Sequence, residues 1–148
     1  MKSNFSSSAA EHDVMPLDAI SRQRLITDWI TIQHSPEGSS EREEAFWAFG
    51  EVWDMCCDAP DDAWDFILAV LAQDSSECQL QNLSAGPLED LLAKHGPYVI
   101  DRVETEARGS PLFAKLLGGV WQNDMSAEIW TRVQAVWDRR GWDGNAEA

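Results

Sequence analysis

Carboxylate side chains are concentrated in one quarter of this 148-residue chain, and they offer its clearest chemistry. The segment from Glu41 to Glu77 holds eleven acids and one base, Arg42, which gives it ten of the chain's fifteen net negative charges. A block of this sign repels nucleic acid and anionic membranes, and it attracts a basic protein at long range. Its acids are Glu41, Glu43, Glu44, Glu51, Asp54, Asp58, Asp61, Asp62, Asp65, Asp74 and Glu77.

Helical periodicity places Trp47 among these acids. At about 100° per residue, one side of a helix carries Trp47 together with Glu44, Glu51, Asp54 and Asp58. Trp47 is then either an anchor for a partner, since tryptophan often dominates binding energy, or a residue that packs under the first helix or the N-terminal arm. The opposite side of the helix carries the predicted core residues Ala45, Phe46, Phe49, Val52, Trp53 and Cys56.

A second acidic face follows on the next helix, where Asp61, Asp62 and Asp65 lie opposite Trp64 and Leu71. A face that is only solvated is more often interrupted by lysines, so two successive acidic faces favour a binding surface. The predicted partner-binding residues are therefore Glu44, Trp47, Glu51, Asp54, Asp58, Asp61, Asp62 and Asp65.

The potential metal ligands of the chain do not match a metal-binding motif. Asp61, Asp62 and Asp65 are expected on a helix, whereas the calcium-binding motif lies in a loop. The sequence has no calcium-binding loop of the Asp-x-Asp-x-Asp-Gly type. Cys56, Cys57 and Cys78 lack the Cys-x-x-Cys spacing of zinc sites, and their odd number argues against a disulfide framework. We therefore predict reduced thiols, no metal and no cofactor.

Nucleophilic catalysis has little support in the sequence. His12 lies in the N-terminal arm, while His34 and His95 lie at predicted helix ends. No Gly-x-Ser-x-Gly elbow, phosphate-binding loop or His-Glu-x-x-His motif occurs. A pair of carboxylates acting as acid and base stays open, because no spacing here fixes its geometry. The protein is not predicted to be an enzyme.

The elements that must position these residues are helices, since no strand pattern competes. An apolar stripe predicts a first helix from near Pro16 to the turn at 35–38. Ser40 and Glu43 fit a capping box for a second helix, which is expected to run to about Cys57.

The remaining helices are marked by their start and stop signals. Asp58 is expected to cap a third helix that has Pro60 in its first turn, and a polar connector at 74–83 follows. Three short helices are then predicted from Pro87 to Gly96, from Pro97 to Gly109, and from Pro111 to Gly118-Gly119.

The last predicted helix begins at the cap Ser126 and ends at Gly141, with Glu128 and Arg132 paired one turn apart. Trp121 is expected in a loop, where it fills a gap or lines a small pocket, and Trp142 is expected beyond the last helix. The tryptophans on apolar faces, which are predicted to be core, are Trp29, Trp53, Trp64, Trp130 and Trp137.

The length and composition predict a single all-α domain, a compact bundle of about six to seven short helices. The sharp connections at Gly96-Pro97 and Ser110-Pro111 favour stacked helical pairs. We expect a disordered arm at 1–15, the helical domain at 16–141, and a frayed tail at 142–148. The absence of a signal peptide and of a membrane span in the sequence predicts a soluble, cytoplasmic protein.

The stretch GPLEDLLAKHGPYVIDRVETEARGSPLFAKLLGGVW, continued by QNDMSAEIWTRV, resembles an uncharacterised bacterial family of small acidic proteins, a domain of unknown function. The resemblance covers roughly Gly86 to Val133, and its most specific pieces are GPLEDLL and LGGVW. It implies a bacterial, all-helical domain. It carries over no catalytic or binding residue, because the family has no assigned activity.

Together these patterns predict a small acidic protein-binding protein. Its expected partner is a basic protein, either toxin-like or nucleic-acid-binding, which it neutralises in the manner of an immunity protein or antitoxin. No direct nucleic-acid or membrane binding is expected. One alternative is a DNA mimic that inhibits a nucleic-acid-binding protein, and a second is an enzyme of unknown reaction.

Overall fold

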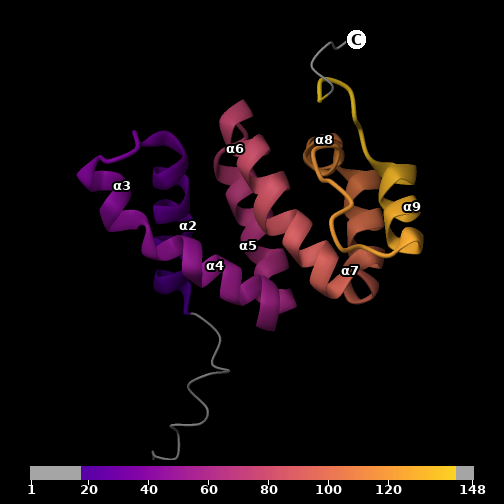
Figure 1. Cartoon of the computed structure of the whole chain (residues 1–148), viewed down its shortest axis with the longest axis horizontal. Coiled ribbons are helices and arrows are strands. Elements are labelled where there is room, and N and C mark those ends of the chain that lie inside the picture. Colours follow the sequence, from indigo (N-terminus) through magenta and orange to yellow (C-terminus); the bar gives the residue numbers. More distant parts are fainter. Residues whose placement is uncertain (1–17, 143–148) are drawn as a thin grey trace, which may run out of the picture.

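The computed structural model describes residues 18–142, and all regular structure in this range is helical, which confirms the all-α prediction. The helices stand side by side along the long axis of the molecule (Figure 1). They are α2 (Ala19–His34), α3 (Ser40–Ala45), α4 (Trp47–Asp58), α5 (Pro60–Gln73), α6 (Glu77–Leu83), the π-helix η3 (Ser84–Leu88), α7 (Glu89–Gly109), α8 (Pro111–Leu117) and α9 (Ala127–Val136).

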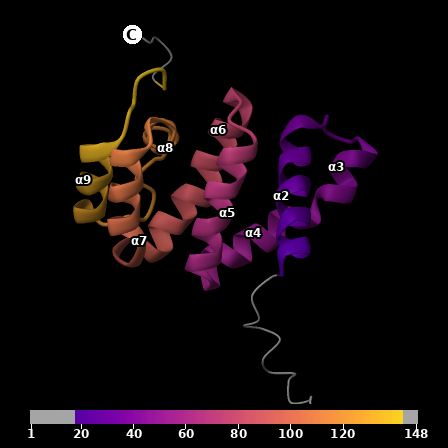
Figure 2. The ribbon, with the colours of Figure 1, turned by 180° about the vertical axis from the view of Figure 1, so that it is seen from behind.

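The ends of the molecule are formed by α2 and α3 on one side and by α8 and α9 on the other (Figure 1). Helix α4 runs along the long axis and crosses in front of α2, whereas from behind it lies beyond α2 and α5 (Figure 2). One broad face of the molecule therefore carries α4. Among residues 18–142, no helix has the length and apolar character needed to cross a membrane. The predicted arm at 1–15 lies outside the described residues.

The second predicted helix is two helices. Helix α3 is capped by Ser39, whose Oγ accepts a hydrogen bond from the Arg42 N–H (3.2 Å), so the predicted capping box of Ser40 and Glu43 is wrong by one residue. The helix then breaks at Phe46, and α4 continues to Asp58. Asp58 therefore ends α4 and does not cap α5, whose N-cap Ala59 makes no side-chain hydrogen bond.

The segment at 74–83, predicted to be a connector, contains helix α6. Ser76 caps this helix by accepting a hydrogen bond from the Gln79 N–H (3.3 Å). Leu80 and Leu83 are buried. Sequence periodicity missed α6 because only these two leucines and one glutamine face inward over seven residues.

Helices α6, η3 and α7 follow one another without a break, so Pro87 does not open a separate helix as predicted. Pro87 lies inside the π-helix, where the wider turn accommodates a residue that has no N–H to donate. Helix α7 consists of two helical segments joined across a kink at His95 (φ −134°, ψ 31°), so the predicted change of helix at Gly96-Pro97 is confirmed to within two residues. At that bend the Nε2 atom of His95 lies 2.9 Å from the carbonyl oxygen of Cys57 in α4. Pro111 begins a helix as predicted, with Ser110 as its cap.

The last helix starts as predicted, because the Ser126 hydroxyl accepts a hydrogen bond from the Ile129 N–H (3.2 Å). It ends five residues before Gly141, and Arg132 binds Glu104 (2.7 Å) and Asp101 (2.8 Å) of α7 instead of Glu128. Arg132 pairs with α7 because Glu104, on this packed neighbouring helix, offers a bidentate contact, which is stronger than a pairing along one helix.

The chain after α9 packs back onto α8. The Asp138 N–H donates to the Ala114 carbonyl oxygen (2.9 Å), and the Trp142 indole N–H donates to the Lys115 carbonyl oxygen (2.8 Å). Trp142 therefore belongs to the packed structure and not to a frayed tail, while 143–148 lie outside the described residues.

A polar chain of hydrogen bonds crosses the core between α2 and α6. The indole N–H of the buried Trp29 donates to Oε1 of Gln79 (2.9 Å), which is fully buried. The Gln79 amide in turn donates to Asp74 (3.1 Å), and Asp74 lies 2.7 Å from Nε2 of His34. We call these four residues the Trp29 network. It ties the end of α2 to the start of α6.

The Trp29 network makes stability depend on pH. Burial by itself would raise the pKa of Asp74, but hydrogen bonds from His34, Gln79 and Ser76 outweigh it and lower the pKa to about 2. A pKa depressed by folding stabilises the fold above pH 4, and this stabilisation is lost as the pH falls from about 4 to about 2.

The substitution Asp74→Asn is expected to remove this acid-dependent part of the stability. Its contribution is about 1 kcal/mol, because solvent screens the partly exposed carboxylate. Urea unfolding at pH 5 and at pH 2.5 measures it as the difference between wild type and variant. Asp124→Asn, on an exposed loop residue without an ion pair in the described structure, is the control that should leave the pH dependence unchanged. An equal loss of stability with acid in wild type and Asp74→Asn would contradict the prediction.

Candidate partner-binding site

Helix α4 presents three strips along its length, one buried and two exposed. The buried strip consists of Ala48, Val52, Met55 and Cys56. The acidic strip consists of Glu51, Asp54 and Asp58, to which the helical period adds Trp47. Between them, the side chains of Phe46, Phe49 and Trp53 form an aromatic strip.

The aromatic strip was predicted to be core, and this prediction is wrong. Phe46, Phe49 and Trp53 are 50%, 43% and 48% exposed. The physical reason is that the small residues Ala48 and Val52 let α4 approach its neighbours closely, which leaves the large rings at the border of the core. The rings contact one another and the core: Phe49 lies 5.1 Å from Phe46 and 5.4 Å from the buried Trp29, between ring centroids.

Gly50 lies inside α4 and within the aromatic strip, four residues after Phe46 and three before Trp53. It is exposed, and a Cβ atom built on it would meet nothing within 4 Å. Glycine in a helix interior costs about 1 kcal/mol relative to alanine. Packing does not require this glycine, so its effect is to leave the helix backbone open between the two aromatic rings.

A pocket of about 250 Å³ opens beside the aromatic strip. We call it the α4–α7 pocket, because residues of α4 and of the chain entering α7 form most of its walls. The π-helix η3 contributes Pro87, whose carbonyl oxygen accepts a hydrogen bond from the Cys56 thiol (3.5 Å). Burial raises the pKa of this thiol to about 12, so it stays neutral. The principal lining residues are Trp29, Phe49, Val52, Trp53, Pro87 and Asp90.

Asp90 is the only ionisable carboxyl group that lines the α4–α7 pocket. Burial raises the pKa of Asp90, and the neighbouring charge of Glu89 raises it further. Glu89 itself accepts hydrogen bonds from the Trp121 N–H (3.1 Å) and from the Asn123 side chain (3.1 Å). The loop that carries Trp121, a 68% exposed residue, is thereby held at the start of α7.

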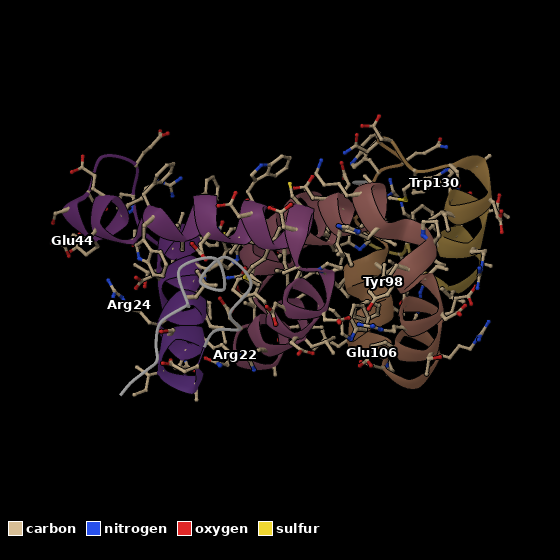
Figure 3. All side chains as sticks on the ribbon, turned by 90° about the horizontal axis from the view of Figure 1, so that it is seen from below. Arg22, Arg24, Glu44, Tyr98, Glu106 and Trp130 are labelled. Atoms are coloured by element: carbon tan, nitrogen blue, oxygen red, sulfur yellow. The ribbon has the colours of Figure 1, made fainter. Side chains whose placement is uncertain are left out.

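The eight predicted partner-binding residues do not gather at one place. Glu44 lies at the α3 end of the molecule, far along the long axis from Tyr98 (Figure 3). Asp61 binds Arg102 (2.7 Å) and accepts a hydrogen bond from the Tyr98 hydroxyl (3.1 Å), and the hydrogen bond from Arg102 lowers the pKa of Asp61. Asp62 lies 3.8 Å from Arg22. Asp61 and Asp62 are thus partly neutralised by bases of this chain.

Trp47 contacts helix α2, in agreement with the interpretation that it packs against the first helix. Its indole N–H donates to Asp28 (2.6 Å), and the Arg24 guanidinium lies 5.1 Å from its ring centroid. The side chain remains 40% exposed and lines a shallow pocket together with Glu51. Trp47 therefore has its polar atom satisfied within the chain, and the exposed part of its side chain is open to a partner.

Five of the predicted acids have no ion pair within residues 18–142: Glu44, Glu51, Asp54, Asp58 and Asp65. Three of these five form the acidic strip of α4. In the same residues, no group of three or more His, Cys, Asp or Glu side chains is arranged to hold a metal ion. All three cysteines are free.

Residues 35–141 match a family described as "Family of unknown function (DUF6869)". The match covers more than half of the chain. The chain belongs to this family. No curated protein and no solved structure matches it.

The DUF6869 match confirms the resemblance to an uncharacterised family, and the stretch from Gly86 to Val133 lies inside it. It begins after α2 and includes the rest of the helical elements, so the aromatic strip and Asp90 lie within the DUF6869 region. Trp29, which forms the floor of the aromatic strip, lies before it. The family description assigns no function, and the candidate site therefore rests on its geometry.

Proposed function

We propose that this DUF6869 protein is a small acidic protein-binding protein that neutralises a basic partner, as immunity proteins and antitoxins do. The observation that carries the proposal is the exposed aromatic strip of α4 beside an unpaired acidic strip. Aromatic side chains dominate the binding energy of protein interfaces, and unpaired carboxylates at their border steer and select a basic surface.

Gly50 favours a close contact between a partner and the aromatic strip. An exposed helix-interior glycine permits close approach of another backbone or side chain between Phe46 and Trp53. The net charge of −15 adds long-range attraction for a basic protein. The proposed interface is therefore centred on α4, with Phe49 and Gly50 in its middle and Asp54 at its border.

The substitution Gly50→Gln tests the proposal without damaging the fold. Glutamine is the better helix former, so unfolding should cost about 0.5 kcal/mol more in the variant. Its side chain would stand between the aromatic rings, and affinity for the partner should fall about tenfold or more. Affinity is measured by calorimetry on the partner that copurifies with the tagged wild-type chain and is identified by mass spectrometry.

Ala135→Gln is the matched control, since it adds the same side chain at an exposed position of α9. It should leave affinity unchanged. An acidic partner, or equal binding by the two glutamine variants, would refute the proposal. Displacement of the chain by duplex DNA would show that the partner is held at its own nucleic-acid site.

A further inference from the structure

The walls of the α4–α7 pocket are aromatic and apolar. Trp29 and Phe49 stand 5.4 Å apart, between centroids, at an interplanar angle of 34°, and Trp53 adds a third ring. The faces of aromatic rings carry negative electrostatic potential and attract organic cations that are desolvated between them. A volume of about 250 Å³ can admit the end of a long side chain but not a folded element.

Asp90 supplies a negative charge to this pocket. Within residues 18–142 its carboxylate makes no hydrogen bond and no ion pair closer than 4 Å. The charge of Lys94, one turn further along α7, favours the ionised form of Asp90 without an ion pair, and a cation in direct contact with the carboxylate would stabilise it further. The charge is positioned by α7, in the turn that directly follows the π-helix.

Lys94 shows that the ring of Trp53 holds an ammonium group. Its Nζ lies 4.7 Å from the ring centroid, which is within the range of a cation–π contact. Lys94 follows Asp90 by one turn of α7, and within residues 18–142 its charge is the only cation on this ring. The aromatic strip thus already makes, with a residue of its own chain, the contact that a partner lysine would make.

We propose that the α4–α7 pocket binds an organic cation on an aliphatic stem, namely a lysine or arginine side chain of the partner, between Trp53 and Asp90. The source of the cation rests on the proposed function, whereas the chemistry of the pocket does not. A free amine offers the same chemistry, and the experiment separates the two sources.

The first arm uses n-butylammonium as the probe and n-butanol as its neutral counterpart. Titration is followed by the indole NH signals of the whole chain in ¹⁵N-resolved NMR spectra, with the Trp53 signal assigned from Trp53→Leu. n-Butylammonium should shift the Trp53 and Trp29 signals saturably, with a dissociation constant in the millimolar range or somewhat weaker. Equal shifts with n-butanol, or no shift at about 0.1 M probe, would overturn the inference.

The second arm compares Asp90→Asn with Asp124→Asn, which removes the same charge from an exposed loop. Asp90→Asn should weaken n-butylammonium binding about tenfold and Asp124→Asn should leave it unchanged. Trp53→Leu, at a half-exposed position, provides an independent variant with the same expected loss.

The third arm uses the partner protein itself. Asp90→Asn should reduce partner affinity about tenfold relative to Asp124→Asn. If the probe binds but the partner is insensitive to Asp90→Asn, the pocket serves a free amine and the inference as stated is wrong. If the partner binds through Gly50 while the probe does not bind, the proposed function survives and this inference fails.

Discussion

Replacement of Gly118 by alanine is expected to destabilise the fold by about 3 kcal/mol, the largest effect among glycine-to-alanine substitutions at residues 18–142. A Cβ atom on Gly118 would lie 2.1 Å from the carbonyl oxygen of Asp138 and 2.8 Å from its carbonyl carbon. Backbone atoms cannot rotate away as a side chain can. The segment that follows α9 would therefore have to leave its place.

That segment makes several contacts which would be lost together. The Gly118 carbonyl accepts a hydrogen bond from Arg139 (2.8 Å), Asp138 donates to Ala114, and Trp142 donates to Lys115. Thermal unfolding of Gly118→Ala should show a midpoint lower by about 10 °C. A loss of Trp142 contact should also appear as a change in indole fluorescence.

Gly109→Ala is the control, because a Cβ there meets nothing within 4 Å at the end of α7. It should change stability by no more than about 0.5 kcal/mol. Gly119→Ala is expected to fall between the two, since its Cβ would meet side-chain atoms of Ser84 (2.5 Å) and Trp142 (2.6 Å), which can move. A stability of Gly118→Ala equal to that of the control would contradict the expected clash.

Loss of the Gln79 amide is expected to have the second-largest effect. Gln79→Leu would leave the Trp29 indole N–H buried without its acceptor, and Asp74 would lose a donor. An unsatisfied buried donor costs about 1–3 kcal/mol, and we expect a loss of about 2 kcal/mol in the free energy of unfolding. Urea unfolding at pH 7 measures it.

A double-mutant cycle separates the hydrogen bond from the change in shape. Trp29→Phe removes the donor while keeping an aromatic ring, so Gln79→Leu should cost at least 1 kcal/mol less in the Trp29→Phe background than in wild type. Additive effects of the two substitutions would mean that the hydrogen bond contributes no coupling energy.

Local signals predicted much of the fold. The serine at 126 and the proline at 111 begin helices as expected, and the turn at 35–38 separates α2 from α3, because caps and prolines act over a few residues. The local signals failed where contacts between residues far apart in the sequence determine the helices. Pro87 lies inside η3 and does not begin a helix, and α6 forms where periodicity is weak, because Gln79 hydrogen-bonds to the buried Trp29 fifty residues earlier in the chain.

The candidate site was less predictable, for a related reason. Helical periodicity assigned Phe49 and Trp53 to the core on the same side as Val52, whereas the inward strip of α4 is built around Ala48 and Val52. The pocket joins α2, α4 and α7, and nothing local to Asp90 reveals that it faces Trp53. Gly50, an interior helix glycine between aromatic residues, is a sequence signal from which the exposed strip could have been inferred.

The unpaired acids of α4 have a consequence for the protein's behaviour toward its own copies. A row of exposed phenylalanine and tryptophan rings favours self-association, in which the aromatic strips of two copies would face each other. Carboxylates at the edge of the row, with a net charge of −15, oppose that meeting over a Debye length of about 8 Å at physiological salt. The acidic strip therefore opposes self-association through the aromatic strip and leaves this surface accessible to a basic partner.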